Sequence, residues 1–278
     1  MEKLFGLFGH PVTHSMSPMM HNDAFQQLGI DASYKLFDVK PEFLKDAVLG
    51  IRALNIVGCN ITIPHKVAVM DFLDEIDDEA KEIGAVNTIV NLDGKLIGYN
   101  TDGRGYLESL VPVLTKRLTE QRVLVLGAGG AARAIVTVLA REGAQEVIVA
   151  NRTLSKAKDL ATLTNHDIIA TTIEEAATEL NQFDIIINTT SVGMSPNIED
   201  IPVSLDKLKA DCVVSDLIYN PIRTKLLIEA DKRGAKILDG VGMFVNQGAL
   251  SFEYWTGQKP NRERMAQLVY QKLGGTLC

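Results

Sequence analysis

Residues 123–132 read Val-Leu-Val-Leu-Gly-Ala-Gly-Gly-Ala-Ala, an apolar run that leads directly into a glycine-rich turn. The turn begins at Gly127 and fits the pattern G-x-G-x-x-A. Where such a turn joins a strand to a helix, backbone N–H groups and the helix N-terminus can hold a pyrophosphate. A second apolar run, residues 147–150, follows at the distance that a strand–helix–strand unit requires. This stretch therefore predicts a dinucleotide-binding α/β fold.

The residues after the second run indicate which dinucleotide binds. An Asp or Glu at this point would accept a hydrogen bond from the ribose 2′-OH of NAD. This chain instead has Asn151, Arg152 and Thr153, followed by Lys156. Cations in the first turn of a helix oppose the helix dipole, and a bound phosphate removes that conflict. The pattern predicts NADP, although the same two cations also suit an exposed helix start.

The composition restricts the class of protein. The chain has 278 residues, 46% of them hydrophobic and 23% charged, with a net charge of −7. These values are typical of a globular protein of about two domains. The negative charge argues against nucleic acid or an anionic membrane as a partner, and no apolar run is long enough to span a membrane. The N-terminus lacks a signal-peptide pattern, and the scattered cysteines and histidines indicate a reducing cytoplasm and no metal site.

The alternation of apolar and polar segments predicts two α/β units. In the second unit we expect parallel strands separated by helices, at 122–126, 146–150, 168–169, 184–188, 212–216 and 236–238. In the first we expect strands at 4–9, 34–39 and 56–63, and a hairpin of 87–91 and 95–99 that turns at Asp93-Gly94. Helices are expected at 17–28 (Ser17 as N-cap, Pro18 first), 41–52, 65–73, 103–114, 131–141, 242–255 and 261–273.

Polar residues of the first unit are arranged in patterns that suit a binding site. Ser15 and Ser17 place two hydroxyls just before a helix, where they could hold a carboxylate or only cap the helix. Asn60 and Thr62 alternate along a strand, so both side chains leave on one face. We therefore expect this face and this helix start to contribute to a polar pocket.

Two neighbouring residues could transfer a proton. A lysine such as Lys66 at a helix start is ordinarily a surface charge, whereas His65 carries the side chain that titrates nearest to neutral pH. The residue types alone do not choose between them. Asp102 precedes a helix and Asn87 begins a strand, and each could equally be a cap or a turn residue.

Together these segments resemble the shikimate dehydrogenase family along essentially the whole chain. The matching motifs are Ser15-Met-Ser17-Pro18, Asn60-Ile-Thr62-Ile-Pro64-His65-Lys66, Gly84-Ala-Val-Asn87-Thr88, Asn100-Thr101-Asp102-Gly103, Gly127-Ala-Gly129-Gly130-Ala131-Ala132, Asn151-Arg152-Thr153, Asn188-Thr-Thr-Ser-Val-Gly193-Met194, Asp216-Leu217-Ile-Tyr219 and Asp239-Gly240-Val-Gly242-Met243 with Gln247. Their order and spacing make the resemblance specific. Lys156 stands where the family commonly has Arg, which weakens a bidentate grip on a phosphate but keeps the charge. Met16 replaces a frequent Leu, a swap that conserves volume.

The resemblance implies an enzyme for the reversible, NADPH-dependent reduction of 3-dehydroshikimate to shikimate, a step toward chorismate and the aromatic amino acids. It implies that Lys66 is the catalytic acid and base, with Asp102 as its acidic partner. The implied substrate-binding residues are Ser15, Ser17, Asn60, Thr62, Lys66, Asn87, Asp102, Tyr219 and Gln247. The implied cofactor-binding residues are Asp78, Gly127, Ala128, Gly129, Gly130, Ala131, Asn151, Arg152, Thr153, Lys156, Leu217 and Gly240.

The resemblance also implies the domain organisation. We expect residues 1–103, with the C-terminal helices of 240–278 packed back on them, to form the substrate-binding and catalytic domain. Residues 104–239 would form a Rossmann-like NADP-binding domain, with a cleft between the two. A cytoplasmic monomer or homodimer is expected, whose partner is a small molecule. Two alternatives stay open: a quinate/shikimate dehydrogenase or aminoshikimate relative on the same scaffold, and a catalytically idle NADP-binding regulator.

Overall fold

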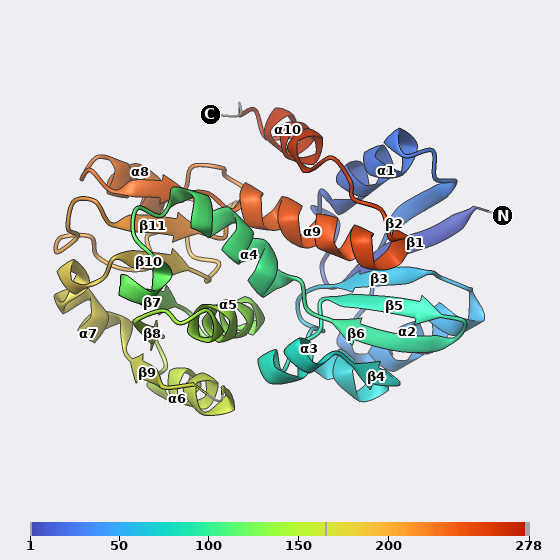
Figure 1. The fold of residues 1–278 in the computed structure, drawn as a ribbon, viewed down its shortest axis with the longest axis horizontal. Coiled ribbons are helices and arrows are strands. Elements are labelled where there is room, and N and C mark those ends of the chain that lie inside the picture. The colour runs from blue at the N-terminus through green and yellow to red at the C-terminus, as the bar shows by residue number, and fades with distance from the viewer. Residues whose placement is uncertain (1, 165, 276–278) are drawn as a thin grey trace. The chain divides into compact units, whose positions relative to one another are not determined.

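The computed structural model of the chain describes residues 2–164 and 166–275 (Figure 1). The chain forms two compact units. The first contains the chain up to Asp102 and again Val245–Lys272, and the second contains Gly103–Phe244 with Leu273–Gly275. Within the described residues, no helix is both long enough and apolar enough to cross a membrane.

The second unit is built on a parallel sheet of six described strands. These strands are β7 (Arg122–Leu126), β8 (Glu146–Ala150), β9 (Ile168–Thr171), β10 (Ile185–Asn188), β11 (Val213–Asp216) and β12 (Lys236–Leu238). They lie in the order β12-β11-β10-β7-β8-β9, and every neighbouring pair is parallel. This is the Rossmann order, in which ligands bind at the carboxyl ends of the strands where the order reverses, here between β7 and β10. The doubly wound fold expected from the sequence is confirmed.

Helices cover both faces of this sheet. One face carries α5 (Gly130–Arg141) and α6 (Leu154–Leu163), and the other carries α7 (Ile173–Thr178) and α8 (Lys225–Asp231). Val123 and Val125 pack in the first layer, whereas Leu124 and Leu126 pack in the second. Because successive strand residues point to opposite faces, a strand that is covered on both sides must be apolar throughout. This requirement explains the unbroken apolar run that ends at the glycine-rich turn.

The first unit contains a mixed sheet. Its strands are β1 (Lys3–Gly9), β2 (Ala32–Asp38), β3 (Gly58–Ile61), β4 (Glu75–Ile76), β5 (Thr88–Leu92) and β6 (Lys95–Tyr99), in the order β2-β1-β3-β5-β6-β4. β5 and β6 form the expected antiparallel hairpin. Asp93 and Gly94 in its turn both have positive φ, which suits Asp and Gly.

The other helices of the chain include short 3-10 segments. The α-helices are α1 (Ser17–Gln27), α2 (Leu44–Ala53), α3 (Asp78–Ile83), α4 (Asp102–Leu110), α9 (Val241–Thr256) and α10 (Arg262–Lys272). The 3-10 helices are Pro41–Phe43, Ala68–Phe72, Val111–Val113, Leu118–Glu120 and Leu180–Gln182. The helix expected at 41–52 thus begins with a 3-10 turn, and the helix expected at 103–114 ends with one.

The predicted cap of the first helix is wrong by one residue. Met16 is the N-cap, without a side-chain hydrogen bond, and Ser17 is the first helical residue. The Ser17 N–H donates to Ser15 Oγ at 3.3 Å, and the two hydroxyls are 3.1 Å apart. The Ser17 hydroxyl is therefore engaged with Ser15 and does not cap the helix.

The predicted helix over residues 65–73 is also wrong. Only the 3-10 helix Ala68–Phe72 forms there. The backbone N–H of Val86 donates to the carbonyl of Lys66 at 2.8 Å, while Met70 N–H turns to the carbonyl of Val67. An α-helix would need the Lys66 carbonyl for Met70, so the tertiary hydrogen bond from Val86 replaces it.

A buried histidine stacks within an aromatic cluster of the first unit. The His21 ring lies 4.5 Å from the ring of Tyr34 and 5.4 Å from that of Trp255. Both of its nitrogens are buried and lack a hydrogen-bond partner among the described residues. Burial lowers the pKa of His21 from 6.5 to about 3. The native ring is therefore neutral, and acid should destabilise this unit.

We predict that His21→Phe flattens the dependence of stability on pH. Below pH 6.5 the unfolded chain binds a proton that the native ring does not, so stability falls as the pH falls. Between pH 7 and pH 5 the wild type should lose about 2 kcal/mol more than the variant. Urea unfolding followed by Trp255 fluorescence at both pH values measures this difference. His14→Phe, at an exposed histidine, is the control; equal losses for wild type and His21→Phe would refute the prediction.

Candidate active site

Lys66 and Asp102 form an ion pair in the first unit. Lys66 Nζ donates to Asp102 Oδ2 at 2.6 Å, and the two side chains are only 17% and 5% exposed. Asp102 is the first residue of α4, where the helix dipole favours negative charge. The Val86 hydrogen bond described above holds the Lys66 backbone beside the start of β5. The result is a cation and a carboxylate in close contact, largely removed from water.

Asn87 holds the other oxygen of the same carboxylate. Asn87 Nδ2 donates to Asp102 Oδ1 at 2.9 Å, and the Thr101 backbone N–H donates to Asn87 Oδ1 at 2.9 Å. Because a backbone N–H can only donate, the amide oxygen of Asn87 must face Thr101 and its NH₂ group must face Asp102. Gln247 Oε1, on α9, lies 3.5 Å from the same NH₂ group. The structure thus brings together four of the predicted residues: Lys66, Asn87, Asp102 and Gln247.

Thr101 is a residue of this cluster that the sequence analysis did not select. It is buried, and its Oγ1 accepts from Asn87 Nδ2 at 2.9 Å and donates to the Gln247 carbonyl at 3.0 Å. It therefore links Asn87, the residue before β5, to the helix that carries Gln247. Its place beside Asp102 in the motif was the available signal.

The remaining predicted substrate residues are Ser15, Ser17, Asn60, Thr62 and Tyr219. Ser15 and Ser17 form the hydroxyl pair at the start of α1. Thr62 follows β3, and its N–H donates to the Phe8 carbonyl. Asn60 is buried and donates to the Asn87 carbonyl at 3.2 Å. Tyr219 belongs to the second unit, where its ring stacks on that of Phe244 at 4.6 Å.

His65, the rival proton donor, is engaged elsewhere. The residue is 1% exposed, and its Nε2 lies 2.6 Å from the carbonyl oxygen of Val39. Since a carbonyl only accepts, Nε2 must carry the proton and donate it. Its neighbour Lys66 contacts Asp102, so the geometry favours Lys66 over His65 for proton transfer.

The glycine-rich turn of the second unit leaves space where a pyrophosphate could bind. Gly127 has a φ of 108°, and a Cβ there would lie 2.6 Å from Thr189 Oγ1. Gly129 is the N-cap of α5, and among the described residues no atom beyond its chain neighbours and its own helix backbone lies within 4 Å of the position that its Cβ would take. Ala128, Gly130 and Ala131 complete the turn and the first residues of α5. Open space above a helix N-terminus fits the phosphates of a dinucleotide.

The basic turn after β8 carries two cations. Asn151 Nδ2 donates to the Thr153 carbonyl at 2.9 Å, which closes the turn, and Thr153 is the N-cap of α6. Arg152 and Lys156 are exposed, and neither side chain has an ion-pair partner in the part of the chain that the structure describes. Two such cations at a helix start fit a 2′-phosphate.

The other predicted cofactor residues do not all share one unit. Gly240 and Leu217 touch in the second unit, since a Cβ on Gly240 would collide with the Leu217 carbonyl oxygen. Asp78 lies in the first unit at the start of α3, where Lys81 pairs with it and lowers its pKa.

A buried carboxylate supports the loops at the carboxyl end of the parallel sheet in the second unit. Asp216 ends β11 and accepts hydrogen bonds from the Thr224 hydroxyl at 2.7 Å, the Asn188 amide at 3.0 Å and the Ile218 N–H at 3.1 Å. Burial raises the pKa of Asp216 to about 6, against these three hydrogen bonds. Sequence reasoning quoted its motif but gave it no role; polar residues at the carboxyl ends of two apolar strands were the signal.

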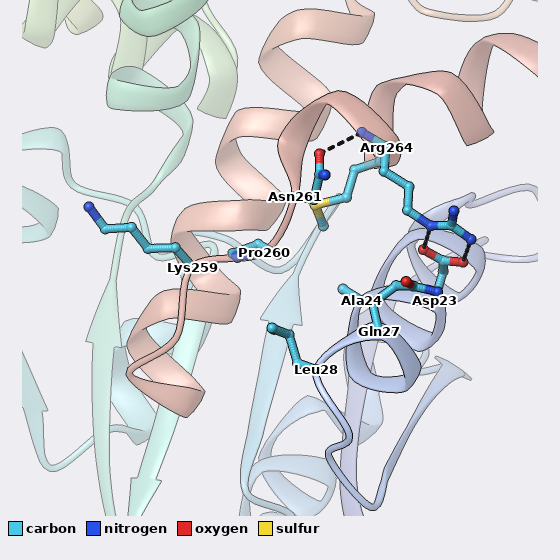
Figure 2. Close-up of a pocket in the computed structure, with 9 residues that line it drawn as sticks. Asp23, Ala24, Gln27, Leu28, Lys259, Pro260, Asn261 and Arg264 are labelled. Atoms are coloured by element: carbon cyan, nitrogen blue, oxygen red, sulfur yellow. Dashed lines mark hydrogen bonds and ion pairs between the residues drawn. The ribbon is translucent and has the colours of Figure 1, made fainter.

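A pocket of about 300 Å³ lies between α1 and the start of α10 (Figure 2). Arg264 at its wall donates to both carboxylate oxygens of Asp23, at 2.6 and 2.7 Å. The cation is therefore already neutralised. Among the residues that line this pocket, none belongs to the predicted substrate set. We do not assign the active site to it.

Comparisons with known proteins identify the family. Residues 7–89 match the model of the shikimate dehydrogenase substrate binding domain, 109–200 that of shikimate / quinate 5-dehydrogenase, and 240–270 that of the shikimate 5'-dehydrogenase C-terminal domain. The shikimate dehydrogenase (NADP(+)) of Bacillus cereus strain AH187 is 55% identical over 277 residues, which cover 99% of this chain and 100% of that protein.

Two solved structures are also similar. A shikimate dehydrogenase in complex with NADP+ superposes with a TM-score of 0.92 at 46% identity, covering 98% of this chain and 96% of the other. The Thermus thermophilus enzyme in complex with NADP(H) and shikimate has a TM-score of 0.87 at 36% identity, covering 97% and 99%. The chain belongs to the shikimate dehydrogenase family.

Proposed function

We propose that this protein catalyses the reversible, NADPH-dependent reduction of 3-dehydroshikimate to shikimate, with Lys66 as the group that donates and accepts the proton. The observation that carries the proposal is the 2.6 Å contact between Lys66 Nζ and Asp102, in a partly buried site that also contains Asn87 and Gln247. Membership of the family supports both the reaction and the use of NADP.

The proton-transfer role follows from the chemistry of the pair. NADPH, when bound, supplies the hydride to the carbonyl carbon of the substrate. Negative charge then develops on the carbonyl oxygen, and a proton from Lys66 Nζ stabilises it. Asp102 holds the ammonium in place, and Asn87 holds Asp102. In the reverse oxidation Lys66 Nζ accepts the proton of the substrate hydroxyl.

The polar residues of the first unit would hold the substrate. Ser15 and Ser17 suit its carboxylate, and Tyr219 of the second unit would supply a third hydroxyl. Thr62, Asn87 and Gln247 suit its ring hydroxyls, together with Lys66 and Asp102. Asn60 is buried behind Asn87, so it would act through Asn87. On this proposal residues 1–103 with 240–278 are the substrate-binding and catalytic domain.

The turns of the second unit would hold the cofactor, which makes residues 104–239 the NADP-binding domain. Residues 127–131 and the N-terminus of α5 suit the pyrophosphate, and residues 151–153 with Lys156 suit the 2′-phosphate. Asp78, Leu217 and Gly240 would lie near the cofactor. We further propose a cytoplasmic monomer or homodimer; the buried free thiols of Cys59 and Cys212 suit a reducing compartment.

We predict that Lys66→Ala lowers kcat by roughly 10²–10⁴-fold, the usual contribution of a positioned acid–base group, with a modest change in KM. Shikimate oxidation followed through NADPH absorbance measures the effect, and quinate as a second substrate tests side activity. Lys95→Ala removes a lysine from an exposed ion pair with Glu75 and should leave kcat unchanged. Activity of Lys66→Ala within a few-fold of wild type would instead exclude Lys66 as the proton donor.

We predict that alanine substitutions at Gly127 and Gly129 have different effects. Gly127→Ala should lower the free energy of unfolding by about 1–3 kcal/mol, because of its positive φ and its contact with Thr189. Gly129→Ala should leave stability within about 0.5 kcal/mol of wild type. Its methyl group would nevertheless occupy the space proposed for the pyrophosphate, so Kd for NADP should rise about tenfold or more. Calorimetric titration measures Kd; unchanged binding by Gly129→Ala would remove the pyrophosphate from this turn.

We predict that Arg152→Glu reverses or abolishes the preference for NADP. The variant loses a charge-assisted hydrogen bond and places a carboxylate where the 2′-phosphate is proposed to bind, so the NADP/NAD ratio of kcat/KM should fall by roughly 10²-fold or more. Steady-state assays with both cofactors measure the ratio. Lys158→Glu, on the exposed face of the same helix, is the control. Equal use of both cofactors by the wild type would contradict the proposed role of the basic turn.

A further inference from the structure

We propose that the buried hydroxyls of Thr88 and Ser251 are positioning residues for the Lys66–Asp102 pair, and that they act through Asn87. The inference rests on the proposed function, because it takes Lys66 as the proton donor. It adds a chain of hydrogen bonds that begins at Tyr34, on the buried side of the site, and ends at the Asp102 carboxylate.

Two amide groups in this chain have orientations that backbone atoms determine. Asn60 Nδ2 faces the Asn87 carbonyl oxygen at 3.2 Å, so that atom must be the NH₂ group. Asn87 Oδ1 faces the Thr101 N–H, as described above, so that atom must be the oxygen. The donors and acceptors of the remaining groups follow from these two.

The direction of each hydroxyl is then determined in turn. Thr88 Oγ1 lies 2.9 Å from Asn87 Oδ1, which only accepts, so the Thr88 hydroxyl donates there. Thr88 Oγ1 also lies 2.7 Å from Ser251 Oγ, from which it can accept. Ser251 Oγ in turn accepts from Asn60 Nδ2 at 2.9 Å and shares its own proton with the Gln247 carbonyl at 2.9 Å.

The far end of the chain is a tyrosine. Tyr34 Oη donates to Asn60 Oδ1 at 2.8 Å, and burial raises the pKa of Tyr34 well above its ordinary value, so the hydroxyl keeps its proton. Donors thus run from Tyr34 to Asn60, from Asn60 to Ser251, and from Thr88 through Asn87 to Asp102. The single Ser251 proton, which faces both Thr88 Oγ1 and the Gln247 carbonyl, can connect the two parts. Aligned hydrogen bonds polarise one another, and here they place the positive end of the chain on the carboxylate that binds Lys66.

The proposed role of Thr88 and Ser251 is to orient the other groups in this chain of hydrogen bonds. Both are buried, and Ser251 lies one turn beyond Gln247 on α9. Its Oγ also approaches Thr101 Oγ1 at 3.3 Å, and Asn60 Nδ2 approaches Thr88 Oγ1 at 3.3 Å. The two hydroxyls therefore join strands β3 and β5 to α9 directly behind Asn87.

Substitutions of nearly equal volume test the proposal. Thr88→Val removes the donor to Asn87 and should lower kcat about tenfold, the effect of losing one such hydrogen bond. Thr88→Ser should restore the activity, and Ser251→Ala should reproduce part of the loss. Thr137→Val is the matched control: it removes a buried hydroxyl of α5 that has no hydrogen-bond partner among the described residues.

A double-mutant cycle separates positioning from a general loss of structure. If Thr88 acts through the ion pair, Thr88→Val should have little further effect in a Lys66→Ala background. Full additivity of the Thr88→Val and Lys66→Ala effects on kcat would overturn this inference and leave the proposed function intact. The same holds if Thr88→Val is as active as Thr137→Val while Lys66→Ala is strongly impaired. A Lys66→Ala variant of nearly wild-type activity would overturn both.

Discussion

The burial of the Asp102 carboxylate is the constraint on which the first unit depends. An ionised group removed from water must be compensated by donors, and removal of one partner leaves the charge exposed to that cost. Here the compensation comes from Lys66 on one oxygen and Asn87 on the other. Each donor is held in turn by groups that reach it from a different strand or helix. The geometry proposed for proton transfer is thus a consequence of satisfying one buried charge.

The second unit meets the same constraint in another way. Asp216 is also buried, but its described partners are a hydroxyl, an amide and a backbone N–H, all neutral. Without a cation, burial dominates and raises its pKa to about 6. Such a carboxylate ties loops together: it joins Asn188, beside the glycine-rich turn, to Thr224 at the start of α8. The two acids show why a buried carboxylate alone does not indicate chemistry; the role proposed for Asp102 depends on its contact with Lys66.

The sequence predicted the second unit better than the first for a physical reason. Strands buried on both faces must be continuously apolar, so the runs at 122–126 and 146–150 could be located with their bounds. The helix expected at 65–73 failed because Val86 takes the carbonyl that an α-helix would use. The cap expected at Ser17 failed because its hydroxyl pairs with Ser15. In both cases a hydrogen bond that the local sequence pattern does not indicate overrides the local propensity.

The candidate site shows the same limit more sharply. Motifs could place Asn87 and Asp102, because each lies at the end of a readable strand or helix. Residue types could not choose between His65 and Lys66, since that choice depends on the Val39 carbonyl, which lies 26 residues before His65. Nor could any local pattern find Ser251, whose bond to Asn60 spans 191 residues. A serine on an apolar helix face does not by itself indicate a site. Only the fold places Ser251 next to Asn60 and Thr88, where its hydroxyl joins the hydrogen bonds that orient the Asn87 amide.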